Sequence, residues 1–590
     1  MRYQKILAIA VSILPAFSQQ VIVVTGTYDP IPLEDADRAI RAMETKSLEL
    51  VSNSIADLLR LDSSLDLQAR SPNGVQSDLS IRGGNFGQTL ILLDGLRLND
   101  AQSGHHNMDV PVPLELIHSV EILKGSGSTL YGSDAVGGVV NFITRPPEAS
   151  EFRLRGAAGN FGANQERGMF SLVEDKWTEQ FSASRDFSTG FIPDRDYRNL
   201  SLASVTHVST RLGFTDLILA NNDRPFGADQ FYGNYNSWER TRTWFAGVRQ
   251  ALGKRTEVAF AYRRHTDLFV LLRDNPQYFT NRHVSEGWQA TVRRDDPLGR
   301  NVRIHYGLEG YRDSIDSNNL GHHERDRGAG YVSIDARAAK RFSFTAGVRE
   351  EVYGTRQTQF SPSVSVGYWV APSLKLRAGA SHAFRLPSYT DLYYHDPANV
   401  GSPNLKPEKA WSYEGGLDWN WRRVRGDVTV FERRETNDID YVRYSTTDIW
   451  RATNFERLSF TGVEASVRFD APKHQLIELQ YTGLHGAQDA LANAYSKYTF
   501  NYPIHSGLVS WQVTLPGQIV TRVRVGALER YARDPYGVLD VYAAMTRGRV
   551  HPFLQLTNLT DTVYQEIYGV PMPGRAFVGG VEIQVITPRK

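Results

Sequence analysis

The segment Val302-Arg-Ile-His-Tyr-Gly-Leu-Glu309 decides the fold class, because its side chains alternate between apolar and polar. In an extended strand one face would carry Val302, Ile304, Tyr306 and Leu308, and the other Arg303, His305 and Glu309. The same alternation recurs at residues 257–263, 363–370, 374–380, 416–421, 463–470 and 518–525. We therefore predict many strands, each with one apolar and one polar face.

Composition narrows the class of protein. The 590 residues include 66 Lys and Arg, 65 Asp and Glu, 10 Trp, 28 Tyr, 27 Phe and no Cys. The net charge of +1 gives no reason to expect a nucleic-acid ligand. Without cysteine, disulfides, thiolate zinc sites, iron–sulfur clusters and thiol catalysis are excluded. Past the N-terminus, no stretch approaches the ~18 apolar residues of a membrane-spanning helix.

The alternating region is too long for one soluble sandwich. About 440 residues follow residue 146. In a transmembrane barrel the apolar face meets lipid and the polar face a wet lumen, and ~9–11 residues per strand suffice to cross. We predict an all-β transmembrane barrel of about 22 antiparallel strands over residues 147–590, with tandem soluble β domains as the alternative.

The first residues have the order of a signal peptide. Arg2 and Lys5 precede an apolar run that ends at Phe17, and Ala16-Phe17-Ser18 resembles a cleavage site. We predict a signal peptide at 1–18 and export. The alternative, a buried N-terminal helix, would be broken by Pro15.

Residues 31–146 differ from the strand-rich remainder. Ser54 to Asp57 reads as a capped helix start, Asp94-Gly95 as a hairpin turn between apolar runs, and Pro113 as the start of a short helix. A strand-like Val120 to Leu123 and a glycine-rich stretch follow. We predict a small α+β domain.

Several motifs resemble those of TonB-dependent outer-membrane receptors. Segments 80–83, 92–99, 119–125 and 128–144 resemble the family's plug domain, and most closely its vitamin B12 (cobalamin) branch. Phe384-Arg-Leu-Pro387 and Asn404-Leu-Lys-Pro-Glu408 resemble a mid-barrel signature, and Asn558-Leu-Thr-Asp561 with Pro573-Gly-Arg575 a C-terminal one. The likeness runs collinearly from about residue 20 to 585.

The resemblance implies function and partners. It implies a monomeric receptor in the outer membrane, among its lipids, with the plug inside the barrel and transport powered by TonB of the inner-membrane TonB–ExbB–ExbD complex. The barrel-assembly machinery would insert it, although Val585 stands where the family commonly ends in an aromatic residue. The cargo would be a metal chelate, either cobalamin or a ferric siderophore, with haem as the alternative. No cofactor is expected.

Enzymatic function is not expected. The sequence has neither a nucleophile elbow nor a His-Glu-x-x-His pattern. An outer-membrane barrel enzyme, the alternative from another class, would have no use for a plug.

Plug-motif residues are carried over from the resemblance: Arg82, Gly83, Asp94, Gly95, Arg97, Glu121, Gly125, Tyr131, Gly132, Gly137 and Gly138. We expect the glycines to permit turns at positive φ and close contact with the wall. Their spacing fits neither phosphate-loop pattern.

The segment Val21, Ile22, Val23, Val24 and Thr25 stands where the family has its TonB box, within a coupling segment at 19–30. An extended β-branched segment can add to a partner's sheet edge. The alternative is an ordinary plug strand.

Substrate-binding candidates come from two plug loops that the resemblance places at the outer mouth: Asn73, Gln102, Ser103, His105 and His106. Haem receptors of the family use a plug histidine and another after the Phe-Arg-x-Pro motif, where His395 stands here. Asp194, Asp196, Asp223 and Asp229 correspond to a region that holds calcium in cobalamin receptors, but Arg195 weighs against this. We expect no metal site.

Overall fold

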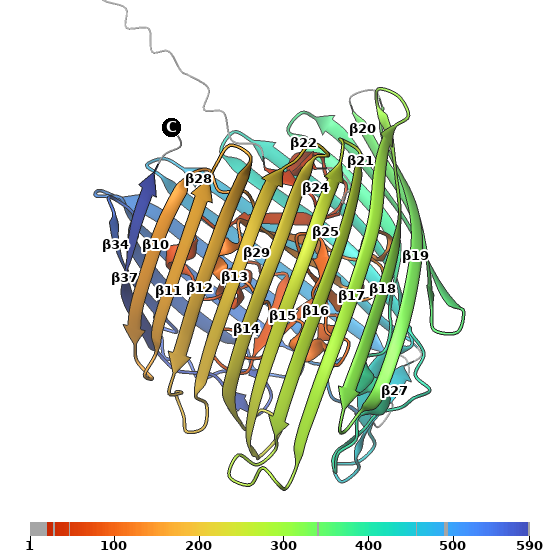
Figure 1. The fold of residues 1–590 in the computed structure, drawn as a ribbon, viewed down its shortest axis with the longest axis vertical. Helices are drawn as coiled ribbons and strands as arrows, with labels where there is room; N and C mark the ends of the chain where they lie inside the picture. Colours follow the sequence, from red (N-terminus) through yellow and green to blue (C-terminus); the bar gives the residue numbers. More distant parts are fainter. Residues whose placement is uncertain are drawn as a thin grey trace, which may run out of the picture.

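A closed barrel of 22 antiparallel strands forms the wall of the molecule (Figure 1). The computed structural model describes residues 21–26, 30–46, 48–338, 341–455, 457–488 and 494–587. The predicted signal peptide, 1–18, lies outside these residues. Within the described part, no helix is long and apolar enough to cross a membrane.

The first half of the wall consists of β10 (Ser150–Gly159), β11 (Asn164–Val173), β12 (Trp177–Ser188), β13 (Tyr197–Ser209), β14 (Phe214–Asp229), β15 (Asn236–Leu252), β16 (Thr256–Val270), β17 (Thr280–Pro297), β18 (Val302–Ser317), β19 (Gly321–Ala338) and β20 (Phe342–Tyr353). The second half consists of β21 (Gln357–Ala371), β22 (Leu374–Arg385), β24 (Glu408–Trp421), β25 (Val424–Thr436), β28 (Leu458–Ala471), β29 (Gln475–Gln488), β31 (Pro503–Leu515), β32 (Ile519–Arg530), β33 (Tyr536–Met545), β34 (Val550–Thr557) and β37 (Ala576–Thr587).

The predicted alternation sets the two faces of this wall. In β18, Leu308 is 70% exposed on the outside, whereas His305 is 1% exposed. Phe214, Trp244 and Val430 are likewise exposed apolar side chains on wall strands. An apolar outer face and a polar inner face are the arrangement of a transmembrane barrel. The predicted fold class is confirmed.

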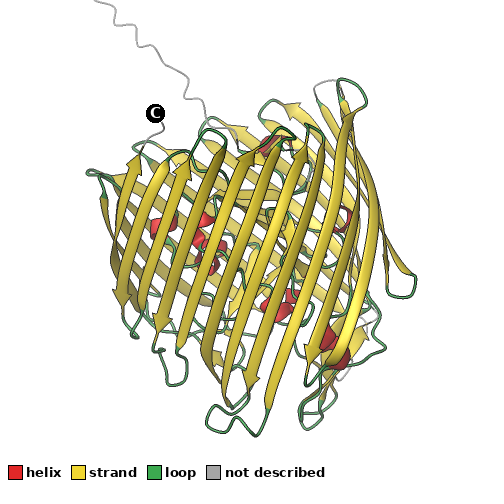
Figure 2. Cartoon of the chain, in the orientation of Figure 1, coloured by secondary structure: helices red, strands yellow, loops and turns green. Residues whose placement is uncertain are grey.

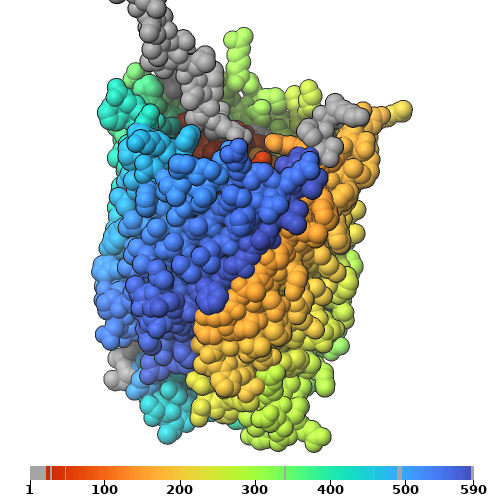
Figure 3. Space-filling view, turned by 90° about the vertical axis from the view of Figure 1, so that its left-hand side faces the viewer, coloured from red at the N-terminus to blue at the C-terminus, as the bar shows by residue number. Residues whose placement is uncertain are grey.

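The barrel closes between its first and last strands. β10 pairs with β37 from Ser150↔Thr587 to Gly159↔Val578. Figure 3 shows this seam as the diagonal boundary between the blue end of the chain and the orange start of the wall. Closure leaves no unpaired strand edge in the wall, which removes a template for aggregation.

The two ends of the barrel differ. The end where β10 begins and β37 finishes, here called the terminal rim, carries short turns such as those at 174–176 and 422–423. The opposite end, the loop rim, carries the long connections after β22, β25, β29 and β34. Those connections contain α3 (Tyr389–Tyr393), β23 (Asn399–Val400), β26 (Asp438–Arg443), β27 (Trp450–Phe455), β30 (Tyr495–Ser496), β35 (Gln565–Ile567) and β36 (Val570–Pro571). We call the sheet β23-β27-β26-β30 the lid sheet.

Inside the barrel lies a smaller domain that holds nearly all the helices (Figure 2). Its five-stranded sheet has the order β3-β8-β9-β6-β7, and β1-β2 and β4-β5 are separate pairs. The strands are β1 (Ile22–Val23), β2 (Ile31–Pro32), β3 (Ile40–Glu44), β4 (Leu65–Ala69), β5 (Ser77–Ile81), β6 (Thr89–Leu93), β7 (Leu96–Arg97), β8 (Ser119–Lys124) and β9 (Gly138–Ile143). The α-helices are α1 (Ile55–Leu59) and α2 (Ser128–Tyr131), and the 3-10 helices are Leu33–Asp35, Glu49–Val51, Phe86–Gln88, Gly104–His106 and Leu114–Leu116.

Local sequence signals explain these inner elements. The Ser54 side chain accepts a hydrogen bond from the Asp57 amide and caps α1. Asp94 (φ 50°) and Gly95 (φ 80°) form the turn between β6 and β7, with Leu93 opposite Leu96. After Pro113 the chain makes a single 3-10 turn. Leu58, Ile91 and Val140, all fully buried, join a core that continues into wall residues such as Val205.

Candidate coupling and ligand-binding sites

The segment 21–25 lies in the inner domain at the terminal rim (Figure 1). Ile22 pairs with Pro32 and Val23 with Ile31 in an antiparallel two-strand ladder. Val23 and Thr25 are fully buried, whereas Ile22 and Val24 are 36% and 37% exposed. The segment is thus a short strand packed on the inner domain, with one apolar edge facing outward.

Glu121 holds this segment in place. Its Oε2 accepts hydrogen bonds from the backbone amides of Val24 (2.9 Å) and Thr25 (2.6 Å). Asn141 donates to the Thr25 hydroxyl at 3.0 Å. Burial raises the pKa of Glu121, although the bonds from Thr25 and Val24 oppose that shift. A plug-motif carboxylate is therefore the direct anchor of the segment.

Arg82 ties the inner domain to the wall. The guanidinium lies 2.7 Å from Glu414 of β24 and 2.9 Å from Glu464 of β28, and all three side chains are buried. Arg82 adopts φ 54° and Gly83 φ 77°, a left-handed turn that glycine permits without strain. A Cβ at Gly83 would meet Phe460 of β28 at 2.6 Å.

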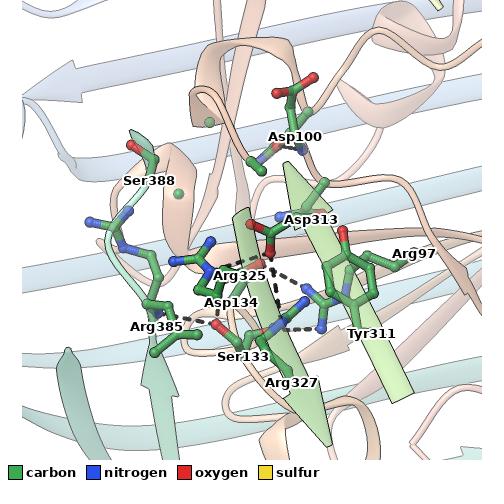
Figure 4. Close-up of a pocket in the computed structure, with 16 residues that line it drawn as sticks. Arg97, Asp100, Ser133, Asp134, Tyr311, Asp313, Arg325, Arg327, Arg385 and Ser388 are labelled. Carbon is green, nitrogen blue, oxygen red and sulfur yellow. Dashed lines mark hydrogen bonds and ion pairs between the residues drawn. The ribbon is translucent and has the colours of Figure 1, made fainter. Parts of the chain in front are cut away.

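Arg97 anchors the turn at residues 131–134, which precedes Gly137 and Gly138. Its guanidinium pairs with Asp134 at 2.7 Å and donates to the carbonyls of Tyr131 and Ser133. Figure 4 shows Arg97, Arg325, Arg327 and Arg385 gathered around a cavity between the inner domain and the wall. Asp313 of β18 pairs with Arg325 at 3.3 Å. The side chains that line the cavity carry nearly equal numbers of positive and negative charges.

The motif glycines divide into two groups. Gly125 (φ 80°) and Gly132 (φ 76°) are in the left-handed region. A Cβ at Gly132 would lie 2.5 Å from Glu351 of the wall, whereas a Cβ at Gly137 or Gly138 would meet the inner domain's own backbone, at the carbonyls of Ile81 and Leu123. The second pair therefore serves packing inside the domain.

The loop residues proposed for substrate binding lie against the wall or within their loop. Asn73 (φ 55°) donates to the Tyr197 hydroxyl at 2.7 Å, and Gln102 donates to Asp267 of β16 at 2.7 Å. Ser103 caps the turn Gly104–His106 by accepting from the His105 amide. Gln102 and Ser103 are buried.

His105 and His106 point to different partners. The His105 ring stacks on Phe86 with centroids 4.1 Å apart, and its Nδ1 lies 2.8 Å from Asp78. Burial lowers the pKa of His105, although Asp78 opposes this. Burial also disfavours the charged form of His106, but Asp267 and Asp109 outweigh it and raise the pKa of His106 to about 10.

His395 is separate from both. It lies exposed after α3 and forms a β-bridge with Val400, and its carbonyl accepts from Asn319 at 2.7 Å. Within the described part of the chain, no hydrogen bond, ion pair or ring contact joins His395 to His105 or His106. The structure does not bring the three imidazoles around one point.

Aromatic and cationic residues of the lid sheet and its neighbours were missed by sequence reasoning. Tyr498 lies edge-on to both Phe86 and His105, at centroid distances of 5.1 and 5.6 Å. Arg443 lies over Trp450 at 4.3 Å. These residues come from loops without periodicity, so only their aromatic content could have pointed to them.

The acidic loop residues are mostly paired with arginine. Arg273 lies 3.1 Å from Asp194 and 2.5 Å from Asp196, and Asp223 pairs with Arg240 at 2.7 Å. Asp229 accepts a hydrogen bond from Gln230.

Comparison with known proteins identifies similar families. The model "TonB dependent receptor-like, beta-barrel" matches residues 174–559, and the model "TonB-dependent Receptor Plug Domain" matches residues 32–139. The vitamin B12 transporter BtuB of Photobacterium profundum is 25% identical over 481 residues, which cover 77% of this chain and 76% of the relative. BtuB of Vibrio vulnificus (strain CMCP6) is 25% identical over 486 residues, covering 76% and 75%.

Solved structures share the fold. The siderophore receptor PirA from Acinetobacter baumannii has a TM-score of 0.77 at 14% identity, covering 92% of this chain and 98% of its own. The FrpB iron transporter from Neisseria meningitidis (F3-3 variant) has a TM-score of 0.79 at 13% identity, covering 93% and 100%.

Proposed function

Because the chain belongs to the TonB-dependent receptor family, we propose that it carries a cobalamin-class metal chelate across the outer membrane and that Val21 to Thr25 is its TonB-coupling segment. One observation carries the coupling proposal: the segment is an edge strand at the terminal rim, on a domain whose other end meets the loop rim. Cargo would enter at one end while force is applied at the other.

The choice of cargo rests on relatives and on side chains. The relatives aligned over three quarters of the chain are named as vitamin B12 transporters. A chelate whose metal is enclosed by its own donors needs only hydrogen bonds and apolar contact from the protein. The Tyr and Trp side chains around the lid sheet suit such a ligand. Haem would need an accessible imidazole on the plug to face its iron, whereas His106 is only 5% exposed and His105 lies stacked between Phe86 and Asp78.

Further proposals complete the assignment. We propose a signal peptide at 1–18, a coupling segment at 19–30, a plug at 31–146 and a barrel at 147–590. ExbB and ExbD would energise TonB, and the barrel-assembly machinery would insert the chain as a monomer. The exposed apolar side chains of the wall suit contact with outer-membrane lipid.

Val23→Pro tests the coupling proposal. Proline lacks the amide hydrogen that edge pairing with a pulling partner needs. We expect uptake of labelled cyanocobalamin by cells to fall strongly while binding to the cell surface changes little. Val23→Ala keeps the backbone donor and is the control. Normal uptake by the proline variant would reduce the segment to an ordinary plug strand.

Ligand binding to the purified protein tests the cargo separately. We expect cyanocobalamin to bind, and His105→Ala or His395→Ala to change its affinity at most about tenfold, because one hydrogen bond contributes ~0.5–1.5 kcal/mol. Haem serves as the competing ligand. Tight haem binding with a Soret band that either substitution abolishes would overturn the cobalamin assignment and leave the coupling proposal standing.

A further inference from the structure

Two histidines and an aspartate meet where the plug loop 101–109 touches the wall. His106 and Asp109 come from the loop, and His265 comes from β16. One ligand atom from each lies within 4.8 Å of the other two. Asp109 Oδ2 is 3.2 Å from His265 Nε2 and 3.9 Å from His106 Nδ1. All three side chains are more than nine-tenths buried.

Local backbone geometry presents the two loop residues together. The turn Gly104–His106 is followed by a hydrogen bond from the Asp109 amide to the His106 carbonyl at 3.1 Å. This turn brings side chains three residues apart to the same side of the chain. His265, which is wholly buried, faces them from the wall.

A second layer of carboxylates orients the imidazoles. Asp100 Oδ2 lies 2.9 Å from His265 Nδ1, and Asp267 Oδ2 lies 3.5 Å from His106 Nε2. In each ring the nitrogen remote from Asp109 therefore faces a carboxylate. A carboxylate behind each imidazole is the usual arrangement around histidines that bind metal ions.

The cluster also gathers several buried carboxylates around the two imidazoles. Four carboxylates surround the two rings, from Asp100, Asp109, Glu239 and Asp267. Arg263 pairs with Asp100 and Arg224 with Asp109 (2.6 Å), so two carboxylates lack an arginine partner. Asp267 Oδ1 is buried and has no hydrogen-bond partner among the described residues. A buried carboxylate oxygen without a partner is costly, and a cation bound in the cluster would stabilise it.

We propose that a divalent transition-metal ion binds between His106 Nδ1, His265 Nε2 and Asp109 Oδ2. Metal bonds of ~2.0–2.2 Å in tetrahedral geometry place ligand atoms ~3.3–3.6 Å apart. The two separations from Asp109 Oδ2, 3.2 and 3.9 Å, are close to this range, and the ligand atoms of the two rings lie within 4.8 Å of each other. Two imidazoles and one carboxylate favour zinc, cobalt or nickel over calcium or magnesium. Water can fill the fourth position. The ion displaces the proton that His106 otherwise holds.

Such an ion would join the plug to the wall. Its ligands come from both domains, so removal of the loop from the wall would require loss of at least one metal bond. At an ion concentration about 100 times Kd, binding would favour the docked loop about 100-fold over a loop that has left the wall. The proposal is independent of the cargo, because the site lies beneath the loop surface.

Metal binding to the whole purified receptor tests the proposal. After bound metal is removed with a chelator and dialysis, we expect the wild type to bind one equivalent of added Zn²⁺, as measured by elemental mass spectrometry. Loaded with Co²⁺, it should show the visible absorption bands of a nitrogen- and oxygen-ligated ion. His106→Gln and His265→Asn should each weaken binding at least tenfold. His105→Ala, on the same loop but paired with Asp78, is the matched control and should bind like the wild type.

Two results would overturn the proposal: no Zn²⁺ binding by folded wild type, or unchanged Zn²⁺ and Co²⁺ binding in both ligand variants. Heat-modifiable migration on SDS gels reports whether each variant folded. If a variant fails this check, X-ray absorption of the Co²⁺-loaded wild type gives the answer, since a shell without imidazole scattering rejects the site.

Discussion

At the scale of single residues, Glu121 links a plug strand to the coupling segment. One carboxylate oxygen accepts two backbone amides, from Val24 and Thr25. Hydrogen bonds to a charged group contribute ~1.5–3 kcal/mol each, more than neutral ones. Glu121 therefore holds the segment against the domain until a partner competes for it.

Glu121→Ala is expected to release the segment. Loss of both charge-assisted bonds should raise the undocked fraction at least ~100-fold, and the periplasmic domain of TonB should bind the purified receptor correspondingly more tightly. Amide hydrogen exchange at Val24 and Thr25 measures the release directly. Glu148→Ala, an exposed carboxylate near the same rim, is the control. Slow exchange in the Glu121 variant would mean that the β1–β2 ladder alone holds the segment.

Asp438 makes the stability of the lid sheet depend on pH. Gln88 of the plug donates one amide nitrogen toward Glu408, Glu435 and Asp438, at 2.9–3.0 Å. Burial, with the charges of Glu408, Glu435 and Asp440, raises the pKa of Asp438 well above its usual value. A raised pKa in the folded state means that the neutral acid is favoured there, so stability falls as the pH rises from the usual carboxyl range through the raised pKa.

We therefore expect the lid sheet to open more readily at pH 9 than at pH 5. Hydrogen exchange of residues 438–443, corrected for intrinsic rates, should show lower protection at the higher pH. Asp438→Asn mimics the neutral acid and should remove most of this difference. Asp448→Asn, exposed on the same connection, should retain it. Equal protection of the wild type at both pH values would contradict the assignment.

At the scale of elements, the wall strands could be predicted and the lid sheet could not. Strands such as β18 carry a period of two because lipid and lumen impose opposite demands on alternate residues. The plug hairpin at Asp94-Gly95 follows from turn chemistry. The lid strands, by contrast, are held by tertiary contacts, such as that of Asp440 with Thr499, and no local pattern encodes them.

For the candidate site, too, the sequence identified some residues but not the tertiary contacts that they make. The identity of Arg82 and Glu121 as plug residues came from motifs, but their partners Glu414, Glu464 and Thr25 lie far away in sequence. His106 was a candidate because it lies in a plug loop. Its pairing with His265, 159 positions away, depends on how the plug sits in the barrel, which periodicity does not specify.

The seam between β10 and β37 depends on one of two adjacent glycines. A Cβ at Gly580 would lie 2.3 Å from the Gly156 carbonyl and 2.6 Å from Ala157 Cβ, whereas at Gly579 the nearest atom, in Leu554, is 3.6 Å away. Gly580→Ala should therefore destabilise the folded barrel by ~1–3 kcal/mol, and Gly579→Ala should have little effect. The urea dependence of heat-modifiable migration compares the two variants. Equal midpoints would show that the seam shifts to accept the methyl group.

At the scale of the whole molecule, the plug lies inside the barrel between the two rims (Figure 2). Ion pairs attach it to the wall, including Arg82 to Glu414 and Arg530 to Asp66 (2.6 Å), and Arg60 attaches it to Glu566 of β35 at the loop rim (2.5 Å). These attachments are ion pairs with hydrogen bonds. When such a pair separates, water can hydrate the two charged groups, whereas exposing an apolar contact to water costs free energy. In the proposed transport cycle, work delivered through Val21 to Thr25 would break some of these attachments and let a chelate pass.

A reversible lock tests whether the plug must leave the wall at β22. Val136 of the plug packs with Ala383 and Ala410 in one buried cluster, and the chain has no cysteine of its own. We expect Val136→Cys with Ala383→Cys to form a disulfide that leaves cyanocobalamin binding intact but stops its uptake, and we expect a membrane-permeant reductant to restore uptake. Each single cysteine variant controls for the substitutions themselves, and mass spectrometry of the linked peptides verifies the bond. Undiminished uptake by the fully oxidised pair would mean that the passage opens elsewhere along the wall, with the plug still attached at β22.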